Sequence, residues 1–192
     1  MTTREPTAID AIAERYTTRL AELDPLTATS IGLRGYDHLM TDFSPSGHAE
    51  RAALDRATLG ELDATSATDP VDEVTLAAMR DRLGLQVELF DAGEHLADLN
   101  VIASPLQGLR DVMDLMPTAT ADDWANIASR LSKVPDAIHG YIASLREGAG
   151  RGLAPALLQV TEGIKQAEEL ADPATSFFVS FADGATVDGA PA

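Results

Sequence analysis

The sequence predicts an all-α fold, a multi-helix bundle-like array, and three observations support this prediction. No segment alternates apolar and polar residues over the length of a strand. Ser-Pro or Asp-Pro pairs stand at several points, where the first residue offers a helix N-cap and the proline suits the first helical turn. The 192 residues are 45% hydrophobic, which is enough for one buried core.

The first half of the chain is expected to form three helices. The first spans about 7–23 and is closed by the Asp-Pro pair that follows, because a residue before proline is driven out of the α region. The second, 44–64, and the third, 69–99, each begin at such a pair. The third has the clearest apolar face, formed at spacings of three and four by Leu76, Met79, Leu83, Val87 and Phe90.

The second half is expected to be helical as well. The expected segments are 105–116, 121–133, 135–148, 155–170 and a short helix after residue 173. The second and third of these form either two helices or one helix kinked at Pro135.

The most apolar segment of the chain, 99–117, is assigned to packing. Its charged residues and internal Ser-Pro pair make it a poor membrane-spanning helix. Residues 99–104 follow no helical period, so we expect a buried crossover in which Asn100 satisfies local backbone groups. After this crossover one apolar stripe is expected to face inward, formed by Leu106, Leu109, Met113 and Met116.

The charge of the chain argues against some classes of partner. Lys and Arg total 14 against 31 Asp and Glu, which gives a net charge of -17 at pH 7. Such a chain repels nucleic-acid phosphates and lacks the polybasic segments that bind anionic membranes, so we expect neither as a partner. It has no cysteine, and hence no disulfide or thiolate metal site. No apolar region follows Arg4, so the start does not resemble a secretory signal and we expect a cytoplasmic location.

Candidates for catalytic chemistry are few. The imidazoles available for proton transfer or metal ligation are those of His38, His48, His95 and His139. The chain has no H-E-x-x-H, Glu-x-x-His, nucleophile-elbow or phosphate-loop motif. Glu88, Asp91 and His95 could share one side of a helix and hold a metal, but a solvated acidic face is the favoured interpretation. We therefore expect no catalytic residue, metal ligand or cofactor in this chain.

The loop 35–47 collects polar side chains between two helices, where functional groups are common. It could line a substrate cleft, or it could be a connector in which Gly35 permits an unusual φ and Asp37 caps a turn. The connector is favoured, because nothing orients His38 toward a nucleophile. The candidate cleft-lining residues are Tyr36, Asp37, His38, Asn100 and Arg110.

Three segments, taken in order, resemble a known family. They are ELDPLTATSIGLRGYDHLMTDFSPSG near the start, LNVIASPLQGLRDVMDLMPTATADDWANIASRL in the middle, and the later VPDAIHGYIASLREGAGRGL. Over nearly its whole length the chain resembles the N-terminal part of the bacterial domain-of-unknown-function family 885 (DUF885).

The resemblance implies a larger, mostly helical, zincin-like metallopeptidase, in which zinc polarises a carbonyl and activates water while a Glu acts as base. The family's zinc-binding segment, His-Glu followed by Pro-Gly-His-His, lies in the C-terminal part and has no match here. Residues 1–183 would then be a helical region that walls or covers the cleft, and 184–192 a flexible or truncated tail. The implied partners are the C-terminal catalytic part and a peptide substrate, and zinc is implied only for a complete member.

A second hypothesis is a stand-alone acidic helical module that binds another protein. Its contact surface would be formed by Phe177, Phe178 and Phe181 or by Met113 and Met116. The reading frame after residue 192 separates the two hypotheses, because only the first expects a His-Glu and His-His segment downstream.

Overall fold

In the first half of the chain the α-helices begin at a Thr, Asp or Ser N-cap, as helix-capping chemistry favours. The computed structural model describes residues 4–188, and this range contains helices and no strand, which confirms the all-α prediction. The elements are α1 (Ala8–Leu23), α2 (Pro25–Ser30), α3 (Pro45–Asp63), α4 (Pro70–Ala92), η1 (Glu94–Leu96), α5 (Pro105–Asp111), η2 (Val112–Leu115), α6 (Ala121–Leu131), α7 (Val134–Gly150), α8 (Leu157–Ala171) and α9 (Phe177–Asp183).

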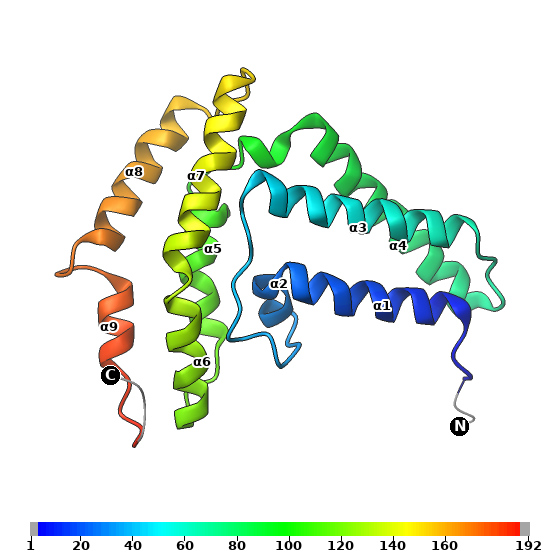
Figure 1. Ribbon diagram of the computed structural model, residues 1–192, viewed down its shortest axis with the longest axis horizontal. Coiled ribbons are helices and arrows are strands. Elements are labelled where there is room, and N and C mark those ends of the chain that lie inside the picture. The colour runs from blue at the N-terminus through cyan, green and yellow to red at the C-terminus, as the bar shows by residue number, and fades with distance from the viewer. Residues whose placement is uncertain (1–3, 189–192) are drawn as a thin grey trace.

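The helices form three neighbouring groups (Figure 1). Helices α1, α3 and α4 pack on one another at the N-terminal side of the molecule. Helices α5, α6 and α7 lie in the middle, and α7 contacts both α3 and η1. Helices α8 and α9 lie on the other side of this middle group (Figure 1), where Gln166 of α8 hydrogen-bonds to Gln107 of α5 and Phe181 of α9 packs on Trp124 of α6.

Helix starts follow the predicted Ser-Pro and Asp-Pro pairs, and the helix predicted over 105–116 is divided into α5 and the 3-10 helix η2. Two further differences concern α4 and α2. Helix α4 ends at Ala92, not near residue 99, because Gly93 adopts a left-handed conformation with φ 82° and the 3-10 helix η1 follows. The Asp-Pro pair that closes α1 also begins the unpredicted helix α2, since the Asp24 carboxylate accepts a hydrogen bond from the Thr27 N–H at 3.3 Å. The open choice over 121–148 is resolved as two helices, α6 and α7.

The buried apolar side chains form two clusters. One joins α1, α3 and α4 through Ile9, Ile12, Leu62 and Leu83. The other joins the middle helices through Leu26, Leu109, Val112, Met113, Met116, Trp124, Ile127 and Ala137. The predicted inward stripe after residue 104 is thereby confirmed for its last three members.

The crossover 99–104 is only partly buried, whereas the prediction had it buried: Ser104 is buried, but Ile102 and Ala103 are exposed. Ile102 is 80% exposed, because side chains satisfy the backbone of the turn without covering it. The Asn100 Oδ1 accepts hydrogen bonds from the N–H groups of Ile102 (2.9 Å) and Ala103 (2.7 Å), which confirms its expected role. From α8, Gln159 accepts from the Val101 N–H at 2.8 Å.

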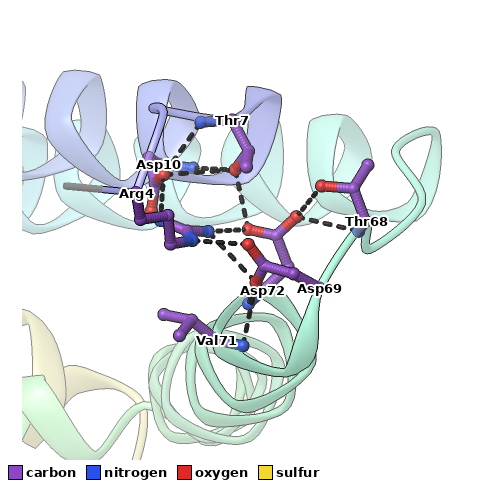
Figure 2. A network of polar contacts seen from close by, with 7 residues as sticks. All are labelled: Arg4, Thr7, Asp10, Thr68, Asp69, Val71 and Asp72. Atoms are coloured by element: carbon purple, nitrogen blue, oxygen red, sulfur yellow. Dashed lines mark hydrogen bonds and ion pairs between the residues drawn. The ribbon is translucent and has the colours of Figure 1, made fainter. Parts of the chain in front are cut away.

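A polar network ties the N-terminal segment to the connection between α3 and α4 (Figure 2). The side chain of Asp72 is fully buried and accepts hydrogen bonds from the Thr7 hydroxyl (2.7 Å) and the Thr68 N–H (2.8 Å). Arg4 pairs with Asp10, Asp69 and Asp72. Burial raises the pKa of Asp72, but the hydrogen bonds from Thr7 and Thr68 and the Arg4 charge outweigh it and lower the pKa to about 2. The network holds the start of α1 against α4.

The segment 184–192, expected as a tail, is described only to residue 188. Ala185 and Val187 pack against the middle cluster. Residues 189–192 lie outside the described residues.

Candidate functional site

A groove of about 1050 Å³ is present among the described residues. It lies between α1, α3 and α4 and continues along η1 to the crossover. We call it the α1–α3–α4 groove. Its apolar wall is formed by Leu20, Met79, Leu83, Leu89, Phe90 and Leu99.

A buried carboxylate lies in the groove between α1 and α3. Asp55 is 7% exposed, and its Oδ1 accepts a hydrogen bond from the Tyr16 hydroxyl at 3.0 Å. Burial raises the pKa of Asp55, while the hydrogen bond from Tyr16 and the charge of Arg51 oppose the shift. Burial and the neighbouring Asp55 charge also raise the pKa of Tyr16, so its hydroxyl stays protonated and remains a donor.

Two imidazoles meet at the other end of the groove. The rings of His48 and His95 are 4.8 Å apart between centroids, and His95 stacks on Phe90 at 4.5 Å. The Nδ1 atom of His48 lies 3.0 Å from an Arg51 nitrogen, which can only donate. The neutral His48 ring therefore carries its proton on Nε2.

Burial lowers the pKa of His48 to about 4, and the Arg51 charge adds to the shift. Burial also lowers the pKa of His95, helped by the charge of Arg151. At neutral pH both rings are uncharged. The groove thus offers neutral nitrogen donors and acceptors beside carboxylates, a set suited to amide and ammonium groups.

Acidification from about pH 6.5 to about pH 4 is expected to destabilise the chain through His48. The unfolded imidazole takes up a proton near its ordinary pKa of 6.5, whereas the folded one stays neutral down to about 4. The unfolded state therefore binds more protons in this window, and the free energy of unfolding falls as pH falls. The contribution of this partly solvated side chain is up to about 2 kcal/mol. Urea unfolding at about pH 7 and about pH 4.5 measures it.

A variant comparison isolates this contribution from the opposite effects of Asp55 and Asp98, whose raised pKa values favour folding in acid. His48→Asn keeps an acceptor near Arg51 and should lose most of the acid destabilisation. The control His139→Asn, at an exposed position of α7, should retain it. Equal acid sensitivity in the wild type and His48→Asn would contradict the assignment.

Glu88, Asp91 and His95, which were considered as a possible metal-binding face, do not come together in one site. Glu88 and Asp91 are exposed on α4, and Asp91 pairs with Arg56 at 2.5 Å. His95 belongs to η1, beyond the end of α4, and packs into the groove. Within residues 4–188 no group of three or more His, Cys, Asp or Glu side chains could hold a metal ion.

The loop residues Tyr36, Asp37 and His38 do not line the groove. They are held instead by α6 and by the residue before α7, because Arg130 of α6 donates to the carbonyl oxygen of Tyr36 at 3.0 Å and Lys133 donates to that of His38 at 2.9 Å. The Asp37 carboxylate accepts from the Thr29 hydroxyl at 2.8 Å.

The other two sequence candidates lie in separate places. Asn100 lies at the crossover end of the groove. Arg110 lies over the ring of Phe177, 4.0 Å from its centroid, beside a smaller hollow of about 240 Å³. The five candidates therefore do not form one site. Whether any of them lines the cleft of a complete protein stays a prediction.

Sequence reasoning named His48, His95 and Asn100 as separate candidates, but it missed Tyr16, Arg51 and Asp55 and did not bring these residues together in one groove. His48, Arg51 and Asp55 recur at spacings of three and four and so share one face of α3. Tyr16 faces them from α1. That polar stripe was the available signal, but its partner on α1 could not be identified from helical periodicity alone.

These features define an all-α protein with an acidic groove between its N-terminal helices. The family model described as "Bacterial protein of unknown function (DUF885)" matches residues 25–191, so the chain belongs to this family. A search of curated proteins finds no match to it. No helix within residues 4–188 has both the length and the apolar character needed to cross a bilayer.

Proposed function

We propose that this chain is the N-terminal helical part of a zinc-dependent peptidase-like hydrolase and walls its substrate cleft. The observation that carries the proposal is the α1–α3–α4 groove, which at about 1050 Å³ can take a polypeptide segment. Membership of DUF885 supports it, because the sequence resemblance implies a zinc hydrolase whose metal motif is C-terminal to this region.

The residues of this chain do not fit a zinc site. Zinc in a hydrolase needs three protein ligands, and no such cluster is present within residues 4–188. The two groove imidazoles supply at most two ligands. We therefore derive no catalytic step through zinc here, and the proposed role of this chain is to bind and orient a substrate.

In this proposed function the partner is the C-terminal catalytic part, the substrate is a peptide and the location is the cytoplasm.

The alternative was a stand-alone interaction module. Of the surfaces considered for it, Met113 and Met116 are buried. The three Phe side chains of α9 pack against the middle cluster, with Phe181 5.5 Å from Trp124 between ring centroids. Neither set therefore favours the alternative.

Zinc content and peptide hydrolysis of the isolated chain test this assignment. We expect no stoichiometric zinc and no turnover, because the chain supplies a binding wall without metal ligands. The reading frame after Ala192 should continue into the His-Glu and His-His segment. Stoichiometric zinc with turnover by the isolated chain would overturn the proposal.

A further inference from the structure

We propose that the α1–α3–α4 groove binds a polypeptide segment that carries lysine or arginine side chains interspersed with apolar ones. The inference deepens the proposed function, on which it rests for the use of the groove by a peptide. It concerns the isolated chain, however, and can be measured without any hydrolysis.

Carboxylates without a partner cation line the groove. They are Asp24, Asp55, Glu94 and Asp98, and within residues 4–188 none of them forms an ion pair. Burial raises the pKa of Asp98, and the Glu94 charge adds to the shift. A cation placed between these two carboxylates would relieve their repulsion.

The cationic side chains of the groove do not balance the negative charge of its carboxylates. Arg51 and Arg82 are the two arginines that line it. The guanidinium of Arg51 donates to the carbonyl oxygens of Asp42 at 2.8 Å and Leu23 at 3.4 Å, so it serves the backbone. These two arginines, of which Arg51 also acts on the Asp55 carboxylate, leave the four lining carboxylates with negative charge in excess. A ligand of positive charge is therefore favoured.

The apolar wall indicates the rest of the ligand. Leu89 is 39% exposed, and Met79, Phe90 and Leu99 are half-buried. Water on these side chains is displaced favourably by leucine-like groups or by the alkyl stems of lysine and arginine. A basic peptide with apolar residues matches both the charge and the wall.

The volume of the groove and its negative charge favour a basic peptide over other ligands. Its volume of about 1050 Å³ lies at the upper end of small-molecule sites, so a segment of chain fits better than a metabolite. A second copy would bring another net charge of -17, and nucleic acid is also negative. Both are disfavoured by repulsion.

Fluorescence anisotropy tests the inference with the full 192-residue chain and a fluorescein-labelled peptide of alternating lysine, leucine and alanine. The comparison peptide has glutamine at each lysine. We expect the lysine peptide to bind about tenfold more tightly at low salt, with the difference shrinking as NaCl is added. Equal binding of the two peptides, or no binding of either, would overturn the inference.

Two double variants separate groove binding from general attraction to an acidic protein. Glu94→Gln with Asp98→Asn removes two groove carboxylates and should weaken binding about fivefold. Glu88→Gln with Asp183→Asn makes the same charge change at exposed positions outside the groove and should leave binding within about twofold. Equal weakening by both variants would overturn the inference.

Failure of the basic-peptide inference can be distinguished from failure of the proposed function. Loss of peptide binding contradicts only the basic-peptide inference. Zinc in the isolated chain contradicts only the assignment of catalysis elsewhere.

Discussion

Replacing Arg130 by methionine is expected to lower the free energy of unfolding by about 3 kcal/mol. The Arg130 side chain is fully buried and donates to the carbonyl oxygen of Leu39 (2.8 Å), the Thr29 hydroxyl (2.9 Å) and the carbonyl oxygen of Tyr36 (3.0 Å). Methionine fills much of the volume but donates nothing, so the buried Thr29 hydroxyl and the two part-buried carbonyl oxygens lose their donor. Urea unfolding near neutral pH measures the change.

The control for this substitution is Arg146→Met, at an exposed position of α7, which should change stability by less than about 0.5 kcal/mol. The loop 35–47 should also become more accessible to proteases in Arg130→Met, because two of the lost hydrogen bonds fix its backbone. A variant as stable as the control would show that the guanidinium does not organise this loop.

Replacing Gly148 by alanine is expected to cost about 2–3 kcal/mol. A Cβ atom at this buried position of α7 would lie 2.2 Å from the carbonyl oxygen of Leu96 and 3.0 Å from that of Leu153. Both contacts are with backbone, which cannot rotate away as a side chain can. Because Leu96 belongs to η1, the substitution should also displace His95 from the groove.

The matched control is Gly84→Ala in the interior of α4, where an added Cβ meets nothing within 4 Å. This change should stabilise the chain by about 0.5–1 kcal/mol, because alanine favours the helix over the unfolded state. If α7 packs on η1 as described, thermal unfolding should show that Gly148→Ala lowers the stability of the chain and that Gly84→Ala raises it. Stabilisation by Gly148→Ala would contradict it.

Much of the fold could be predicted from local chemistry. The starts of α1, α3, α4 and α5 follow from capping residues and prolines, which act within one helical turn. The inward stripe of Met113 and Met116 follows from helical period. The end of α4 was misplaced because the prediction continued the helix past Gly93, whose left-handed conformation stops it.

The groove could not be predicted in the same way, because it depends on contacts between distant residues. Tyr16 and Asp55 belong to different helices, and His48 meets His95 only because α4 ends where it does. The crossover was predicted as buried from its composition, yet Ile102 is exposed. Apolar composition alone does not reveal which backbone groups a side chain such as Asn100 can satisfy.

We propose that this chain walls the substrate cleft of a zinc-dependent hydrolase. Peptide hydrolysis by the protein encoded in the whole reading frame tests it most directly, with a bulky side chain placed in the groove. Ala78→Trp occupies an exposed position that lines the groove, while Ala77→Trp lies beside it and does not. We predict chelator-sensitive hydrolysis whose kcat/KM falls about tenfold or more in Ala78→Trp and stays near wild type in Ala77→Trp, at equal zinc content. Hydrolysis that is independent of zinc, or equally fast in both variants, would contradict the proposed role of the groove.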